Sequence, residues 1–123
     1  MGQSTVLIVE DDLDVSETLA LVLGDEGYET ALAMNGAEAL ELLRNGLGPC
    51  LIVLDLMMPV MDGYAFRAEQ QKDPTLATIP TVILSAAQGL AAEAKKLDVD
   101  EYLAKPVRLD ALLEVLKRSC RKD

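Results

Sequence analysis

Short apolar runs alternate along this chain with longer segments in which apolar residues recur at helical spacing. The first run, TVLIV at residues 5–9, is continuous and rich in β-branched side chains, which is typical of a strand buried on both faces. In residues 13–24 the apolar positions instead form one stripe of a helix, which ends at Gly24 and Gly27. The pattern therefore predicts a buried strand followed by a helix.

The same strand–helix unit repeats four more times. The later strands are predicted at residues 28–34, 51–54, 81–84 and 101–104, and the helices are expected to begin near Asn35, Asp62, Gly89 and Leu109. The strand at residues 28–34 is more polar and is expected to lie at an outer position, whereas the other strands are apolar runs rather than alternating patterns. The sequence thus predicts an α/β fold in which a five-stranded parallel sheet carries helices on both faces.

Polar residues follow directly on most of the predicted strands. In a parallel sheet these positions share one edge, which is where ligands bind. The residues are Glu10, Asp11 and Asp12 after the first strand, Asp55 after the third, Ser85 after the fourth and Lys105 after the fifth. The second strand is followed by Asn35, which offers no obvious reactive group.

The carboxylates at this edge indicate a divalent cation. Crowded acids repel one another, and a shared cation relieves that repulsion. Magnesium suits the site better than zinc because the ligands are oxygens, the chain has no His, and neither Cys follows a strand at this edge. A lysine and a hydroxyl beside the metal would bind an anion. Together these groups are suited to phosphoryl transfer with Asp55 as the nucleophile.

Each of these residues also has a purely structural interpretation. Asp11, Asp12 and Asp14 are suited to capping and charging the first turn of a helix. Ser85 alone is typical of a cap, and Lys105 alone of a solvated surface charge. What favours a site is that four chemically compatible groups each follow directly on a different apolar strand.

Other phosphate and metal motifs fail on spacing. No Gly-rich turn follows the first strand, so neither the dinucleotide fingerprint nor the P-loop is present. A haloacid dehalogenase phosphatase has a second Asp two positions after its nucleophile, where this chain has Met57. An EF-hand calcium loop requires alternating acids and a central Gly, which EDDLDVSETL lacks.

Composition narrows the class of protein and its partners. The length of 123 residues matches one domain, and a net charge of −10 argues against direct nucleic-acid binding, which depends on clustered Lys and Arg. No apolar run is long enough to span a membrane, and no basic segment precedes the first apolar run as in a signal peptide. Cys50 and Cys120 follow no metal or redox spacing, so a reduced, cytoplasmic setting is expected.

Four motifs in this order make the chain resemble the receiver domain of bacterial two-component response regulators: VLIVEDD, LIVLDLMMPVMDGY, VILSA and EYLAKP. The resemblance covers about residues 5–117 and leaves residues 118–123 as a tail or the start of a linker. It implies a flavodoxin-like (βα)5 domain with strand order 2-1-3-4-5. In that order the first and third strands are neighbours, which would place Asp11 beside Asp55.

The resemblance implies a phosphoryl acceptor and a metal site. Asp55 would accept a phosphoryl group from a phosphohistidine on a sensor kinase or phosphotransfer protein. Asp11, Asp55 and the backbone carbonyl of Met57 would bind Mg²⁺, with Glu10 acting through water. Asp12 would lie outside the metal shell. Because the chain has no His, it can be only the recipient in such a transfer.

The resemblance also implies a switch. Lys105 would pair with Asp55 or its phosphoryl group, and Ser85 would hydrogen-bond a phosphoryl oxygen. Tyr102 would be the aromatic residue that turns inward when Ser85 moves. The Lys105–Pro106 bond is expected to be cis. Such a domain signals rather than converts an outside substrate: it catalyses its own phosphorylation and slow dephosphorylation, and a protein-interaction face changes.

The resemblance leaves other points open. Met57 and Ala87 are apolar where a polar residue could orient an attacking water, which predicts slow self-dephosphorylation. The alternative function is a phosphorylation-independent protein-interaction module, although such modules usually lose an acid, the lysine or the hydroxyl, and this chain retains all of them. The expected partners are the kinase or phosphotransfer protein, a downstream target or fused output domain, and a phosphorylation-linked homodimer, with no membrane partner.

Overall fold

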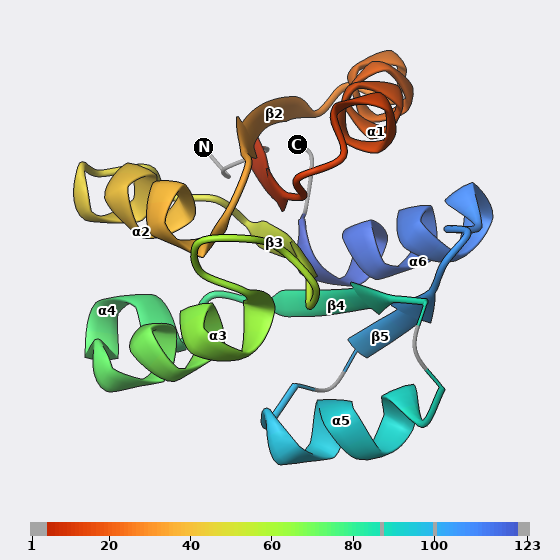
Figure 1. Cartoon of the computed structure of the whole chain (residues 1–123). Helices are drawn as coiled ribbons and strands as arrows, with labels where there is room; N and C mark the ends of the chain where they lie inside the picture. The colour runs from red at the N-terminus through yellow and green to blue at the C-terminus, as the bar shows by residue number, and fades with distance from the viewer. Residues whose placement is uncertain (1–4, 87, 100, 121–123) are drawn as a thin grey trace.

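The computed structural model describes residues 5–86, 88–99 and 101–120. Its single sheet contains five parallel strands in the order β2-β1-β3-β4-β5 (Figure 1). The strands are β1 Thr5–Val9, β2 Glu29–Ala33, β3 Leu51–Asp55, β4 Thr81–Ser85 and β5 Glu101–Ala104. The predicted fold class and strand order are therefore confirmed, and each strand lies within one residue of its predicted bounds.

Helices cover both faces of the sheet (Figure 1). They are α1 Leu13–Asp25, α2 Gly36–Arg44, α3 Gly63–Lys72, α4 Pro74–Ala77, α5 Leu90–Lys96 and α6 Leu109–Ser119. The one-turn helix α4 was not predicted. Its sequence signal is local, because Asp73 accepts a hydrogen bond from the Thr75 N–H and Pro74 occupies the first helical position.

The alternation of side chains along the strands divides the core into two clusters. Leu7 and Val9 of β1 face α2, α3 and α5, whereas Val6 and Ile8 face α1 and α6. All four side chains are fully buried. Since burying one such side chain stabilises a fold by roughly 1.5–3 kcal/mol, the three central strands form a rigid support for the residues at their ends.

Two close backbone approaches fix the segment between β3 and α3. A Cβ on Gly63 would lie 2.6 Å from the Asp55 carbonyl oxygen and 2.7 Å from the Leu56 Cα, and the Gly63 N–H donates to the Leu56 carbonyl at 3.0 Å. Asp62 caps α3 by accepting from the Ala65 N–H. The Asp62-Gly63 pair therefore brings the start of α3 against the chain that follows Asp55.

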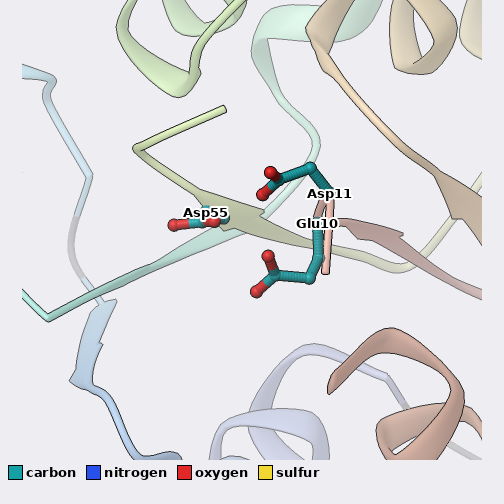
Figure 2. Close-up of side chains that lie close together, drawn as sticks. All are labelled: Glu10, Asp11 and Asp55. Atoms are coloured by element: carbon teal, nitrogen blue, oxygen red, sulfur yellow. The ribbon is translucent and has the colours of Figure 1, made fainter. Parts of the chain in front are cut away.

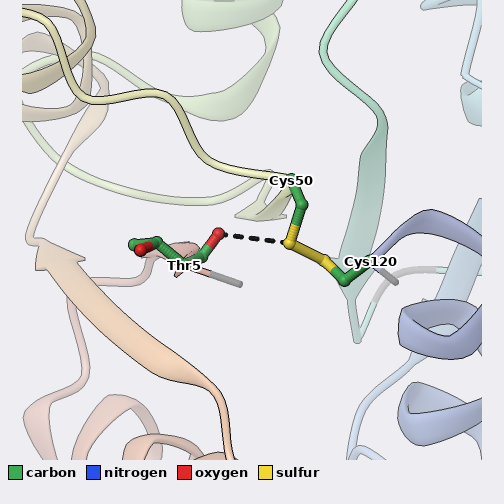
Figure 3. The surroundings of a disulfide bond; sticks show 3 residues. All are labelled: Thr5, Cys50 and Cys120. Carbon is green, nitrogen blue, oxygen red and sulfur yellow. Dashed lines mark hydrogen bonds between the residues drawn. A yellow bond between two sulfur atoms is a disulfide. The ribbon is translucent and has the colours of Figure 1, made fainter. Parts of the chain in front are cut away.

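The two cysteines form a disulfide between the start of β3 and the end of α6 (Figure 3). Cys50 and Cys120 are 70 residues apart in sequence, and their Cα atoms are 5.2 Å apart. The expectation of reduced cysteines is therefore wrong for this structure. It failed because the pairing depends on strand order, which brings distant segments together, and not on a local Cys spacing.

The packed domain extends past the expected core of residues 5–117. Helix α6 continues to Ser119, and Cys120 is buried. The Lys105–Pro106 bond is cis, as expected. No helix in the described part of the chain is long and apolar enough to cross a membrane.

Candidate functional site

Three carboxylates meet at the carboxyl edge of the sheet. Figure 2 shows Glu10, Asp11 and Asp55 together, and one oxygen of each lies within 4.8 Å of the others. Glu10 and Asp11 follow β1, and Asp55 ends β3; the two strands are paired, with Val9 opposite Leu54. Glu10 is 1% and Asp55 3% exposed, whereas Asp11 is half-buried. The predicted placement of Asp11 beside Asp55 is what the structure shows.

Among the described residues, Lys105 is the only cation that forms an ion pair with these acids. Its Nζ lies 2.6 Å from Oε1 of Glu10 and 3.3 Å from Oδ2 of Asp55. Partial burial by itself lowers the pKa of Lys105. The hydrogen bond to Glu10 and the charges of Asp55 and Glu10 together outweigh burial, so that the pKa is raised above its usual value. Lys105 is therefore held as an ammonium beside both acids.

Backbone N–H groups orient two of the carboxylates. The Met57 N–H donates to Oδ1 of Asp55 at 3.2 Å, and the Asp12 N–H donates to Oε2 of Glu10 at 3.1 Å. Each acid thus has one oxygen held by the backbone and the other paired with Lys105. The Asp12 side chain does not join the cluster, because it caps α1 by accepting from the N–H groups of Asp14 and Val15.

Ser85 and Tyr102 occupy different positions relative to the acids. Ser85 ends β4, the neighbour of β3, and is 1% exposed; its carbonyl accepts from the Lys105 N–H at 3.0 Å. Tyr102 lies on β5 and is 45% exposed. It lines a cavity of about 260 Å³ together with Ala91, Ala94 and Lys95 of α5. Ser85 is thus at the acid edge, and the Tyr102 ring faces outward beside α5.

The donor set of the cluster fits a hard divalent cation. Its ligand atoms are carboxylate oxygens, and the chain contains no His. The two Cys residues form a disulfide at the opposite edge of the sheet, where β3 begins, so they are not ligands of this cluster. Three carboxylates and one ammonium also leave excess negative charge, which Mg²⁺ would offset. The cluster can therefore bind Mg²⁺ and hold the Asp55 carboxylate beside it.

The Glu10–Lys105 pair was not predicted. Sequence order placed both residues at the carboxyl edge, but β3 and β4 lie between their strands in the sheet. Only the long lysine side chain spans that separation. A signal was available in the two strand ends, where a Glu and a Lys both follow directly on apolar runs.

Comparison with known proteins identifies the family. The family model for the response regulator receiver domain matches residues 6–117. The chain is 36% identical over 119 residues to the response regulator MprA of Mycobacterium sp. (strain KMS), covering 95% of this chain and 50% of that protein. This chain belongs to the response regulator receiver domain family. It spans about half the length of the MprA proteins that it matches.

Solved structures agree in fold over nearly the whole chain. A putative response regulator from Chloroflexus aurantiacus is 33% identical with a TM-score of 0.83, and the match covers 94% of this chain and 96% of that one. The chemotaxis protein CheY4 of Vibrio cholerae is 28% identical with a TM-score of 0.84, covering 95% and 98%. The fold is thus flavodoxin-like, as in these receivers. The family binds Mg²⁺ at an acidic pocket, and this chain has a cluster of Glu10, Asp11 and Asp55.

Proposed function

We propose that Asp55 accepts a phosphoryl group from a phosphohistidine of a sensor kinase or phosphotransfer protein, and that this modification changes a protein-interaction face. The observation that carries the proposal is the position of Asp55, which ends a fully buried strand, lies beside Glu10 and Asp11, and is 3.3 Å from Lys105. A nucleophile fixed in this way needs little reorganisation to react.

The transfer step requires an oxygen of Asp55 to bond to phosphorus while the P–N bond to the donor histidine breaks. The electron pair stays on the imidazole nitrogen, which takes a proton. Mg²⁺ bound by Asp11, Asp55 and the Met57 backbone carbonyl, with Glu10 acting through water, would supply positive charge to the phosphoryl oxygens. The Met57 N–H holds Oδ1 of Asp55, and Lys105 lies beside Oδ2, where its charge would stabilise the incoming group.

The signalling step follows from the added charge. A phosphoryl group brings about −1.5 to −2 charges and three acceptor oxygens. Lys105 would then exchange its contact with Glu10 for a phosphoryl oxygen, and Ser85 would donate its hydroxyl to another. The Tyr102 ring, which is 45% exposed here, would turn inward. The surface of α5 and β5 would change in consequence, and it would present that change to a downstream target, a fused output domain or a second copy of the domain.

The lifetime of the phosphoryl group is expected to be long. Met57 follows Asp55 by two positions, and its apolar side chain is 66% exposed, so it offers no group that could orient a water. Ala87, the second residue on which this expectation depends, lies outside the described residues. We place the domain in the cytoplasm, where sensor kinases present their phosphohistidines; the Cys50–Cys120 disulfide is a bond that the reducing conditions of this compartment oppose.

Phosphorylation by a small-molecule phosphodonor tests the proposal. The native chain, Asp55→Asn and Asp12→Asn would each be incubated with acetyl phosphate, with and without Mg²⁺, and read by intact mass. We expect one Mg²⁺-dependent phosphoryl group on the native chain and on Asp12→Asn, whose side chain caps α1 outside the cluster, and none on Asp55→Asn. Absence of label on the native chain with Mg²⁺ would instead favour the phosphorylation-independent interaction module.

A further inference from the structure

Helix α5 is held by few apolar contacts. Of its seven residues, only Leu90 and Ala94 are buried. Its N-cap is Gly89, which has no side chain to accept a hydrogen bond from the first turn. Helix α3 lies on the same face of the sheet (Figure 1). Tyr64 of α3 bonds to α5, and Arg67 and Gln71 of α3 bond to the two residues that follow α5. Because so few of its side chains are buried, these contacts have a large share in fixing the position of α5.

The C-terminal end of α5 is bound by a buried arginine. Arg67 of α3 is 6% exposed, and it donates from Nε to the Leu97 carbonyl at 2.8 Å and from Nη2 to the Asp98 carbonyl at 2.7 Å. The last carbonyls of a helix lack partners within it and carry partial negative charge, so a guanidinium is well suited to this position. The Val99 N–H also donates back to the Ala94 carbonyl at 2.9 Å.

Arg67 is itself fixed to the sheet through Gln70. Its Nη1 donates to Oε1 of Gln70 at 2.8 Å. Gln70 is fully buried, and its Nε2 donates to the Leu76 carbonyl at 3.0 Å and to Oγ1 of Thr81, the first residue of β4, at 3.2 Å. Buried, fully bonded polar groups of this kind are costly to separate. The Arg67 contact is therefore a rigid attachment for one end of α5.

Among the described residues, one side-chain hydrogen bond joins α3 to a residue within α5 itself. The Tyr64 hydroxyl donates to Oε1 of Glu93 at 2.7 Å. This bond, followed by burial and the charge of Glu93, raises the pKa of Tyr64; the same bond lowers the pKa of Glu93. Glu93 also forms an exposed ion pair with Lys96 at 3.5 Å. The Tyr64–Glu93 hydrogen bond is half-buried and made by one hydroxyl, so it is more easily broken than the hydrogen bonds of Arg67.

We propose that α5 rotates about its Arg67-bound end when the domain switches, and that the Tyr64–Glu93 hydrogen bond restrains the middle of the helix in the unphosphorylated arrangement. The inference rests on the proposed function. Three residues separate Ser85 from Gly89, so movement of Ser85 toward a phosphoryl group pulls first on the N-terminal end of α5, against the restraint at Glu93. Tyr64 is then a positioning residue that sets how readily Asp55 is modified, although it does not touch Asp55.

Amide hydrogen exchange in the unlabelled chain tests the restraint directly. In Tyr64→Phe, which keeps the ring, we expect the amides of residues 92–95 to exchange about tenfold faster, whereas the Val99 amide is unchanged. Glu93→Gln keeps an acceptor for the Tyr64 hydroxyl and should exchange as the native chain does. Lys96→Ala, which removes only the exposed ion pair, is the matched control. Equal exchange in the native chain and Tyr64→Phe would overturn the restraint.

Labelling with acetyl phosphate and Mg²⁺ then tests the rotation. We expect faster exchange of residues 92–95 in the native chain, little change at Val99, and little further effect in Tyr64→Phe, which should be labelled several-fold faster. A change at Val99 as large as that at Ala92 would overturn rotation about the Arg67 end. If neither the native chain nor Tyr64→Phe is phosphorylated, the proposed function and the rotation both fail. Hydrogen exchange in the two unlabelled proteins then still decides whether Tyr64 restrains α5.

Discussion

Lys105 is closer to Glu10 than to Asp55. Its Nζ is 2.6 Å from the carboxylate of Glu10 and 3.3 Å from that of Asp55. Lys105 therefore connects the ends of β5, β1 and β3 through one ammonium group. Because a bound cation would compete with this ammonium for the same two carboxylates, the lysine sets both the stability of the acid cluster and its affinity for metal.

Removal of the ammonium should strengthen Mg²⁺ binding. Lys105→Met keeps an unbranched apolar side chain in place of the lysine stem, but the carboxylates lose the positive charge that opposes a second cation. We expect the Mg²⁺ dissociation constant to fall by about tenfold at low salt, measured by isothermal titration calorimetry. Lys117→Met, which removes an exposed lysine far from the cluster, should bind Mg²⁺ as the native chain does. Weaker binding in Lys105→Met would show that Lys105 does not oppose the metal.

The same variant should reveal a pH-dependent contribution to stability. The folded pKa of Lys105 is raised above the 10.5 of the free side chain, so its contribution is complete below pH 10.5 and is lost as the pH rises through the folded pKa. At pH 8 we expect Lys105→Met to be about 1–3 kcal/mol less stable in urea without Mg²⁺, because Glu10 and Asp55 lose a partner. The difference should shrink above pH 10.5. A difference that grows with pH would contradict this assignment.

The sequence was sufficient to locate the strands and to predict which acids lie at the carboxyl edge of the sheet. The central strands β1, β3 and β4 are buried, so apolar runs locate them, whereas the edge strands β2 and β5 are partly exposed. The residues that follow parallel strands must share an edge. Asp11 and Asp55 could be placed together on that basis, once the resemblance supplied the strand order. The contacts between side chains could not be predicted. No pattern in the sequence singled out Arg67 or Gln70, yet both are buried, and Arg67 bonds to the carbonyls that follow α5.

The disulfide should stabilise the domain without affecting the acid cluster. It closes a loop of 70 residues, for which the loss of chain entropy in the unfolded state corresponds to about 4 kcal/mol. Adding dithiothreitol should lower the urea midpoint of the native chain, whereas the Cys50→Ser, Cys120→Ser double variant should not respond. Labelling of Asp55 should be unchanged, since Cys50 lies before β3 and Asp55 ends it. Complete alkylation of both thiols in the folded, unreduced protein would refute the bond.

Position 63 should not tolerate a side chain, because Gly63 lies close to the backbone at Asp55 and Leu56. In Gly63→Ala the new Cβ would lie 2.6 Å from the Asp55 carbonyl oxygen, so the start of α3 must move. We expect a loss of about 1–3 kcal/mol in urea unfolding and slower labelling of Asp55, because Met57 and its N–H move with the loop. Gly48→Ala is the control, since nothing lies within 4 Å of its Cβ position. Equal labelling rates in the two variants would mean that this contact does not position Asp55.

A polar residue at position 57 should shorten the life of the phosphoryl group. The Met57 side chain is 66% exposed, and its N–H bonds Asp55, so a carboxamide there can reach a water near the phosphoryl group without repacking the core. We expect Met57→Asn to lose its phosphoryl group several-fold faster than the native chain, followed by intact mass after the donor is removed. Val60→Asn places the same group in the same loop at a residue that is 86% exposed, and it should behave as the native chain does. If both variants lose the group at the native rate, the slow step does not depend on orienting a water at position 57, and the apolar character of Met57 has no bearing on signal lifetime.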